Sequence, residues 1–426
     1  MIASTSALRL SRSALSTSAR SSNVALRSTR FISTTKSSSA IVESGVSHGH
    51  KSQQPAYVPS THHQPPTHQF AKQEKLSQQP FISDALRTFS NFDTTPATGT
   101  EFRSVSTDGK PVLSIQEVMQ DAEKVRALAH LIAERGVVFF RAGEISAKEQ
   151  RDLVDALGKS THKPATSTLH VHPLSNEGQE HGDEIAVISN HFDFHKDAKR
   201  DGDSILNLKP GDVLSRPLQK NLWHTDITFE PVPSDYACLS IRTFPREGGG
   251  DTLWASAYEA YDRLSPAYQR FLEGMTATHT GQYFIDIARK YNLNFRQQRG
   301  SPDNTGDSLS AIHPVIRTNP VTGWKGLFVN KEFTKRINQL TPDESENVLN
   351  YLFEHISANH DLHTRFRWEP NSLAIWDNRS SLHAATYDLD GATREGTRAC
   401  SVGERPYFDA NSVSRRTALA AAGRQQ

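Results

Sequence analysis

The sequence places a histidine and an aspartate two residues apart, His224 and Asp226, within the stretch NLWHTDITF at residues 221–229. Aromatic and β-branched residues surround the pair, and because strands favour such residues we expect this stretch to be a β-strand. Side chains alternate between the two faces of a strand, so the imidazole and the carboxylate would share one face. Such a pair could be two metal ligands, two thirds of a hydrolase relay, or an ordinary surface pair.

The sequence lacks the usual partners for two common hydrolytic chemistries. A zinc hydrolase would carry a helical H-E-x-x-H motif, and a serine hydrolase would carry a nucleophile elbow; neither occurs. The remaining chemistry is a facial triad of two histidines and one carboxylate, which leaves coordination positions of Fe(II) open. Its second histidine would be His383, which follows the apolar segment 372–378. The alternative for His383 is a buried, hydrogen-bonded histidine without a metal.

Several ordered blocks around these residues are similar to one known family. The blocks are LHVHP, WHTDITF, GGGDTLWAS, HPVIRTNPVTGWKGLFVN, RFRWEPNSLAIWDNR and SSLHAATYD, followed by two arginines and GERPY. In order and spacing they resemble the taurine dioxygenase family of Fe(II)/2-oxoglutarate-dependent dioxygenases, in its fungal sulfonate dioxygenase form. The resemblance extends from about Val137 to Phe408.

The resemblance implies three groups of site residues: the iron ligands His224, Asp226 and His383; the 2-oxoglutarate residues Thr252 and Arg394; and the substrate residues His172 and Arg398. The planar guanidinium fork of arginine matches a carboxylate or a sulfonate in bidentate fashion. If residues 393–402 form a strand, Arg394 and Arg398 face the same side about 13 Å apart, which suits two different anions. The alternative for the two arginines is that they are surface charges paired with Glu395 and Glu404. We interpret His170, beside His172, as structural because of its opposite strand direction.

The resemblance also implies the reaction. Fe(II) and O2 would oxidatively decarboxylate 2-oxoglutarate to succinate and CO2, and the carbon beside sulfur in the substrate would be hydroxylated. The hydroxylated product would lose sulfite or sulfate and leave an aldehyde. We therefore expect a dioxygenase that acts on a small anionic organosulfonate, with taurine-like compounds first, or on an alkyl sulfate ester. The alternatives are a carboxylate or carnitine-pathway substrate, and a non-catalytic 2-oxoglutarate-binding protein.

The sequence departs from the family at two places near the expected substrate. The connection 190–222 is longer and more basic toward its end, and we interpret it as an insert that could act as a lid. Position 175 is a serine where the best-known members place an aromatic residue against the substrate. Both differences concern the identity of the substrate rather than the iron and 2-oxoglutarate sites.

The surrounding elements predict a mostly β protein with flanking helices and a double-stranded β-helix, or jelly-roll, core. Helical spacing and capping residues predict helices over 120–136, 146–158, 265–275 and 341–357. Short apolar runs predict strands over 137–142, 183–189, 236–244, 250–256, 326–330 and 372–378. Many short strands with a few helices laid against them are typical of this fold class.

Composition separates the chain into a folded body and two kinds of extension. Hydrophobic residues make up only 36% of the 426 residues and the mean hydropathy is −0.57, so a sizeable part of the chain lies outside any core. We expect a disordered Pro/Gln/His linker at 41–85, the dioxygenase domain at 86–409, and a disordered tail at 410–426. Two cysteines exclude a disulfide framework. No apolar run is long enough for a transmembrane helix, so we expect no membrane insertion.

The first forty residues contain six basic residues and no acidic one. This Ser- and Arg-rich composition is typical of a mitochondrial presequence, so we expect a mitochondrial protein, with a cytoplasmic location as the alternative. The whole chain has a net charge of +1, so the remainder carries −5. An acidic body indicates no nucleic-acid partner; the chain could form a homo-oligomer.

Overall fold

The computed structural model describes residues 84–190 and 219–423. The expected presequence at 1–40, nearly all of the linker at 41–85 and most of the insert at 190–222 lie outside the described residues. The presequence, the linker and the lid therefore stay predictions.

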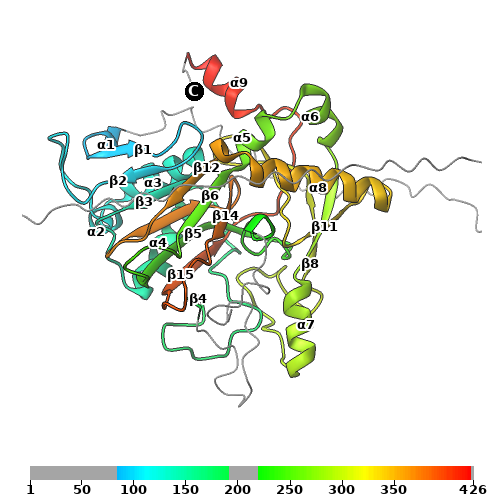
Figure 1. Cartoon of the computed structure of the whole chain (residues 1–426), viewed down its shortest axis with the longest axis horizontal. Helices are drawn as coiled ribbons and strands as arrows, with labels where there is room; N and C mark the ends of the chain where they lie inside the picture. The colour runs from blue at the N-terminus through cyan, green and yellow to red at the C-terminus, as the bar shows by residue number, and fades with distance from the viewer. Residues whose placement is uncertain (1–83, 191–218, 424–426) are drawn as a thin grey trace, which may run out of the picture. The chain divides into compact units, whose positions relative to one another are not determined.

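The described chain alternates short strands with helices (Figure 1). The helices are α1 (Asp84–Arg87), α2 (Ile115–Met119), α3 (Ala122–Arg135), α4 (Ala147–Ser160), α5 (Ala257–Asp262), α6 (Pro266–Leu272), α7 (Gln282–Tyr291), α8 (Pro342–Ala358) and α9 (Arg415–Ala421), with short 3-10 turns η1 (Gln219–Asn221) and η2 (His360–Leu362). None of the helices in the described ranges is both long and apolar enough to cross a membrane.

Two facing sheets form the centre of the described chain. The large sheet has the order β1-β2-β3-β13-β5-β15-β4 and the small sheet the order β12-β6-β14. The strands of the large sheet are β1 (Asn91–Asp93), β2 (Thr100–Phe102), β3 (Val137–Phe140), β4 (Ile185–Ser189), β5 (Ser234–Thr243), β13 (Leu373–Asp377) and β15 (Glu395–Val402). Those of the small sheet are β6 (Thr252–Ser256), β12 (His363–Phe366) and β14 (Ser381–Ala385). This is the mostly β, jelly-roll architecture that the sequence predicts.

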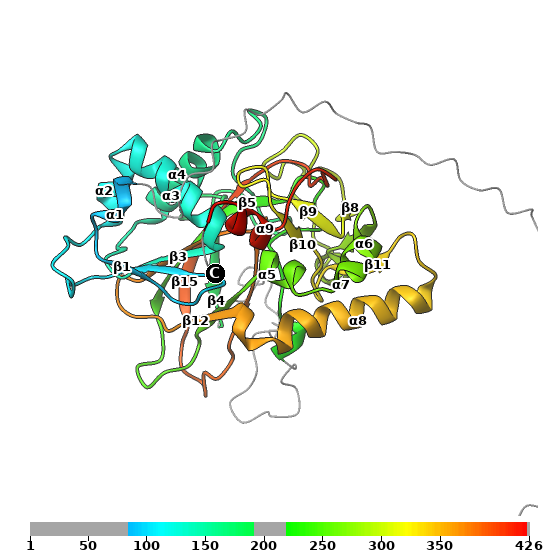
Figure 2. The ribbon, with the colours of Figure 1, turned by 90° about the horizontal axis from the view of Figure 1, so that it is seen from above.

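Further strands form two smaller sheets beside this core. One sheet has the order β11-β7-β8 and the other pairs β10 with β9. These strands are β7 (Thr276–Thr280), β8 (Ser310–Pro314), β9 (Ile316–Thr318), β10 (Lys325–Leu327) and β11 (Thr334–Ile337). Figures 1 and 2 place α3 and α4 at the large sheet and α8 on the other side of the core, beside β11.

Strand β3 shows why the large sheet reads as continuous apolar sequence. Val137 and Phe139 belong to the core between the two sheets, whereas Val138 and Phe140 belong to the core under α2, α3 and α4. Both faces are covered, so no position of the strand is left for a polar residue. Phe139 stacks on Phe366 of β12 with ring centroids 4.2 Å apart, which joins the two sheets.

The predicted helix boundaries follow the local capping chemistry. Gly136 ends α3 with a φ of 77°, a conformation that glycine adopts without a Cβ penalty. Ser146 and Glu149 form the predicted capping box at the start of α4. The predicted end of α4 at Gly158 is wrong, because the helix continues to Ser160 and is closed by Thr161.

The prediction that residues 221–229 form a strand is also wrong. His224 makes a single bridge with His383, and the chain then turns, with Ile227 at a φ of 50°. The aromatic and β-branched residues of this stretch are buried for packing rather than for strand pairing, and periodicity does not distinguish the two.

The prediction of a disordered tail from residue 410 is wrong for the described residues up to 423. This segment contains α9, and Val413 bridges to Trp324. The side chain of Arg415 is 2% exposed, donates a hydrogen bond to the carbonyl of Pro96 at 2.9 Å and lies 3.7 Å from Glu259. The local sequence did not predict this helix, because the residues that stabilise α9 come from distant segments of the chain.

We expect deletion of residues 410–426 to lower the free energy of unfolding by about 3 kcal/mol, because it removes arginines that neutralise the buried Glu259. Urea denaturation followed by circular dichroism measures this change. A shorter truncation after Gly423, which keeps α9, should change the value by less than about 0.5 kcal/mol. Equal urea midpoints for the two truncations would contradict a stabilising role for α9.

Candidate metal centre

His224, Asp226 and His383 come together in the structure, as the sequence predicts. One ligand atom from each lies within 4.8 Å of the others. Within residues 84–190 and 219–423, no other group of three histidine, cysteine or acidic side chains meets this condition. The sequence separates the two histidines by 159 positions, so only the fold brings them together.

Backbone hydrogen bonds hold the two histidines side by side. The amide of His224 donates to the carbonyl of His383 at 3.0 Å, and the amide of His383 donates to the carbonyl of His224 at 2.8 Å. His383 lies on β14, whose partner at this position is Trp254 of β6. The two imidazole centroids are 4.2 Å apart as a result.

The carboxylate of Asp226 is positioned by the turn that follows His224. The backbone amide of Asp226 donates to Oδ1 of Asn378 at 3.1 Å. Asn378 itself accepts from Trp376 at 3.0 Å and donates to Ser234 at 3.0 Å. The side chain of Asn378 is therefore fixed on three sides, and it fixes the backbone of Asp226 in turn.

Two further buried residues of the same segment, Thr228 and Glu230, secure the turn. Nε2 of His313 donates to the carbonyls of Thr228 and Glu230, at 2.9 and 3.1 Å. Glu230 forms a buried ion pair with Arg299, with Oε2 and Nη2 3.1 Å apart. These partners hold Ile227 in a left-handed conformation that a β-branched residue otherwise avoids. The sequence signal that could have identified Thr228 and Glu230 is the polar residue at every second position from 224 to 230.

The protonation states of the three side chains suit a divalent cation. Burial and the neighbouring His224 hold the pKa of His383 well below its usual value, so this imidazole is neutral. Burial acts to raise the pKa of Asp226, but Arg398 and the two histidines outweigh it, so the carboxylate is ionised. Nδ1 of His224 donates to the carbonyl of Leu222 at 2.8 Å, which leaves Nε2 as the metal-binding atom. This donor set fits Fe(II).

Arg394 and Thr252, predicted to act together, are in contact. Nη2 of Arg394 donates to Oγ1 of Thr252 at 3.1 Å, and Nε donates to the carbonyl of Gly250 at 2.7 Å. Trp368 donates to the same threonine oxygen at 3.1 Å. Burial lowers the pKa of Arg394 to about 10, so the guanidinium remains charged at neutral pH.

Arg398 contacts the metal centre directly. Its Nη1 donates to Oδ1 of Asp226 at 2.6 Å. The alternative pairing of the two predicted arginines with Glu395 and Glu404 is wrong, because Glu404 pairs with Arg317 and no ion pair joins Glu395 to a described residue. A register shift between Glu395 and Gly396 interrupts the regular alternation that the sequence argument assumed.

His172 lies near Arg398, as predicted. Its Nδ1 accepts from the amide of Leu174 at 3.2 Å, so Nε2 carries the proton. Burial and Arg398 lower the pKa of His172 to about 3, which keeps the ring neutral. His170 was interpreted as structural on the basis of strand alternation, but only Leu169 in this stretch makes a bridge. The buried ring of His170 is 6.5 Å from that of His172, so it lies at the same site.

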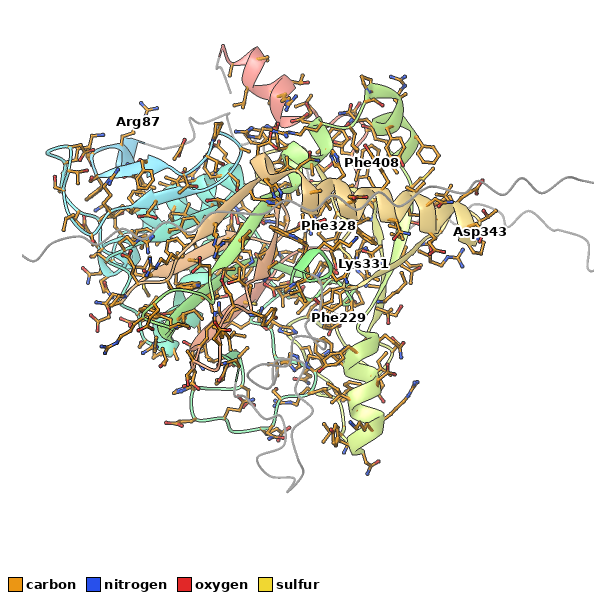
Figure 3. All side chains as sticks on the ribbon, in the orientation of Figure 1. Arg87, Phe229, Phe328, Lys331, Asp343 and Phe408 are labelled. Carbon is orange, nitrogen blue, oxygen red and sulfur yellow. The ribbon has the colours of Figure 1, made fainter. Side chains whose placement is uncertain are left out.

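Sequence reasoning missed other residues around His224. Oε2 of Glu332 lies 3.6 Å from Nδ1 of His224. Phe229, labelled in Figure 3, packs against Phe333 with ring centroids 5.2 Å apart, and Phe333 lies 6.2 Å from His224. These contacts depend on β11 and the loop before it, which no local motif links to the metal ligands.

Comparison with known proteins identifies the family. The profile of the family described as taurine catabolism dioxygenase TauD, TfdA family, matches residues 93–400. The chain belongs to this family. The matched range contains each of the seven predicted site residues.

Relatives of the TauD family extend this finding. The alpha-ketoglutarate-dependent dioxygenase btcD of Neocamarosporium betae is 41% identical over 350 residues, which cover 78% of this chain and 96% of btcD. The alpha-ketoglutarate-dependent sulfonate dioxygenase of Saccharomyces cerevisiae is 33% identical over 292 residues, or 68% of this chain and 63% of that protein.

A solved structure of the TauD family agrees with the fold. The crystal structure of a taurine dioxygenase from Burkholderia xenovorans matches with a TM-score of 0.51 and 24% identity, and covers 75% of this chain and 92% of that one. This TauD-family chain is an alpha-ketoglutarate-dependent dioxygenase, whose cofactor is Fe(II) and whose cosubstrates are 2-oxoglutarate and O2.

We expect the substitution Asn378→Ala to weaken metal binding by about tenfold, because it frees the backbone of Asp226. Anaerobic titration with Fe(II), or with Co(II) followed by its visible absorption, measures the affinity. The exposed Asn294 provides the matched control, and Asn294→Ala should leave the affinity unchanged. A folded Asn378→Ala protein with the original affinity would contradict the positioning role.

Proposed function

We propose that this dioxygenase hydroxylates a small organosulfonate or alkyl sulfate ester at the carbon beside the anionic group. The observation that carries the proposal is the guanidinium of Arg398, which reaches Asp226 beside the metal centre. An anionic head bound there would hold the neighbouring carbon of a short substrate next to the iron. The yeast relative is named a sulfonate dioxygenase, which supports the same substrate class.

The surroundings of the two arginines support their proposed assignments. Arg394 is 6% exposed, and two of its donors bind Thr252 and Gly250, which orients its guanidinium fork for the distal carboxylate of 2-oxoglutarate. Arg398 is 18% exposed, and its Nε has no hydrogen-bond partner among the described residues. This Nε is shielded from solvent, so the exposed part of the guanidinium would bind a sulfonate oxygen while Nη1 remains with Asp226.

His172 would complete the receptor for the anion. Its Nε2 carries a proton, and a neutral imidazole donates a hydrogen bond without adding charge. The edge of Phe284 meets this ring with the centroids 5.0 Å apart, which restricts its orientation. His172 and Arg398 would hold the substrate from two directions.

The bound iron and 2-oxoglutarate supply the oxidising power that breaks a C–H bond with O2. The chain's own residues orient the reactants: Asn378 and the His224–His383 bridge hold the ligands, Arg394 holds the cosubstrate, and Arg398 holds the anion. Correct placement of reactants accounts for several kcal/mol of a barrier. A positively charged receptor also disfavours a quaternary amine such as a carnitine precursor.

We expect the purified chain, supplied with Fe(II), ascorbate and 2-oxoglutarate, to release succinate and sulfite with taurine or another short sulfonate. A panel of sulfonates, alkyl sulfates and matched carboxylates, with succinate and sulfite measured separately, tests this. Succinate formed only with carboxylates would replace the proposed substrate class. No substrate-dependent succinate with any member would contradict the proposal.

We expect the two arginine variants to separate cosubstrate from substrate binding. Arg394→Gln should raise the KM for 2-oxoglutarate by about tenfold or more, and Arg398→Gln should raise the KM for the sulfonate by a similar factor. Steady-state kinetics with each compound varied in turn measures the split. Iron content is determined for both variants, because Arg398 also contacts Asp226. Equal effects of both substitutions on both KM values would contradict the assignment.

A further inference from the structure

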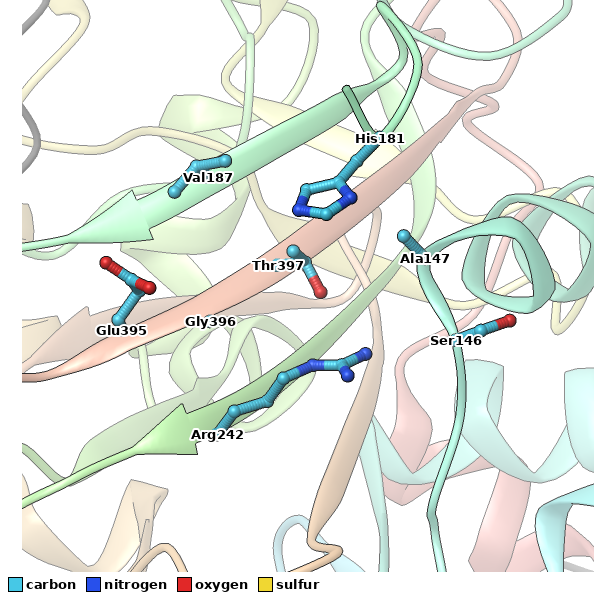
Figure 4. Close-up of a pocket in the computed structure, with 8 residues that line it drawn as sticks. All are labelled: Ser146, Ala147, His181, Val187, Arg242, Glu395, Gly396 and Thr397. Carbon is cyan, nitrogen blue, oxygen red and sulfur yellow. The ribbon is translucent and has the colours of Figure 1, made fainter. Parts of the chain in front are cut away.

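A second cavity lies outside the metal centre, on the face of the large sheet that α4 covers (Figure 4). It has a volume of about 400 Å³ and lies beside the start of α4, where Ser146 and Ala147 line it. Its walls come from β4, β5, β15 and the first residues of α4. We call it the outer cavity.

The outer cavity is separated from the metal centre by the sheet itself. Thr397 of β15 lines the cavity, whereas the next residue, Arg398, extends to Asp226. Successive side chains of a strand point to opposite faces, so the two residues serve different compartments. Thr397 pairs with Ser240 of β5 and Val187 of β4, which places the cavity over the middle of three adjacent strands.

Thr397 forms part of the wall of the outer cavity but does not present its hydroxyl to it. Its side chain is 7% exposed, and its Oγ1 is shielded from solvent and has no hydrogen-bond partner among the described residues. The polar contacts for a ligand therefore come from the charged residues of the wall.

Two side chains of opposite charge lie at different parts of the cavity wall. Arg242 donates to the carbonyl of Ile145 at 2.7 Å but forms no ion pair with a described residue. Glu395 likewise has no ion-pair partner in the described part of the chain. In Figure 4 the guanidinium of Arg242 extends toward Ser146, whereas the carboxylate of Glu395 points away from it, toward Val187.

We propose that the outer cavity binds a small zwitterion, a molecule with an acidic group at one end and an ammonium group at the other. The acidic group binds Arg242, whose planar fork accepts a carboxylate or sulfonate. The ammonium group binds Glu395. Val187 and Ala147 provide the apolar wall for the connecting carbons, and His181 lies on the same wall as Thr397.

The charge pattern decides between ligand classes. A dianion would place its second acidic group near Glu395, and a cation would meet Arg242, so both are disfavoured. A zwitterion satisfies both charged groups at once. The volume of about 400 Å³ accommodates a compound of amino-acid size.

The test is direct binding to the full chain with the metal centre filled by Mn(II) and N-oxalylglycine. The proposed substrate receptor at Arg398 stays open in this complex, so the titrations are repeated with Arg398→Gln, which should weaken binding at that receptor but not in the outer cavity. The probes are β-alanine, 4-aminobutanoate and 6-aminohexanoate, which span a range of charge separations. Butanoate and butylamine each retain one charged group of 4-aminobutanoate. We expect at least one amino acid to bind with a Kd of about 1 mM or lower by isothermal titration calorimetry. Both half-ligands should bind at least about tenfold more weakly.

Matched variants locate the binding. Arg242→Gln and Glu395→Gln should each weaken the affinity by about tenfold or more, whereas Arg246→Gln, which changes an exposed arginine four positions further along, should not.

Three results would overturn the proposal. One is the absence of binding by all three amino acids. Another is undiminished binding to both Arg242→Gln and Glu395→Gln. The third is binding of butanoate as tight as that of the amino acids and insensitive to Glu395→Gln, which would identify a receptor for simple anions.

Discussion

The reciprocal backbone hydrogen bonds between His224 and His383 are the constraint on which the site depends. They join a turn from the middle of the chain to β14, and they set the imidazoles 4.2 Å apart. Asp226 lies in the same turn as His224, and Arg398 donates a hydrogen bond to Asp226. The metal ligands are therefore placed by one short piece of β-structure, and β15 brings Arg398 of the proposed substrate receptor to it.

The metal centre buries charged side chains away from water, and each of them is paired with a nearby side chain of opposite charge. Asp226 is ionised because Arg398 faces it, and Arg398 keeps its proton because Asp226 faces it: burial alone would lower the pKa of Arg398, but the carboxylate raises it. Glu230 and Arg299 repeat the arrangement behind the turn. Buried pairs of this kind contribute little net stability but make the loss of one partner expensive. In each of these pairs, the charge of one side chain is thus stabilised by the other, although the pair as a whole adds little to the free energy of unfolding.

Sequence reasoning was strongest where the signal is local. Capping residues defined α3, α4 and α8, and the types and spacing of His224, Asp226, His383, Arg394 and Arg398 indicated the site. It failed where conformation depends on distant partners. The left-handed Ile227 requires Glu230, Arg299 and His313 around it, α9 requires Pro96 and Glu259, and the outer cavity requires three strands and a helix end to meet. The periodicity of a sequence contains no information on contacts between segments that are far apart in the chain.

The position of β15 has a consequence for how the protein is made. This strand is synthesised well after β4 and β5, yet it lies between them in the large sheet. Until it is synthesised, the ten residues of β5 have an unpaired edge, which is a template for aggregation. Insertion of a late central strand is also a slow, non-local step. The edge of β5 that pairs with β15 therefore stays open until β15 has been synthesised.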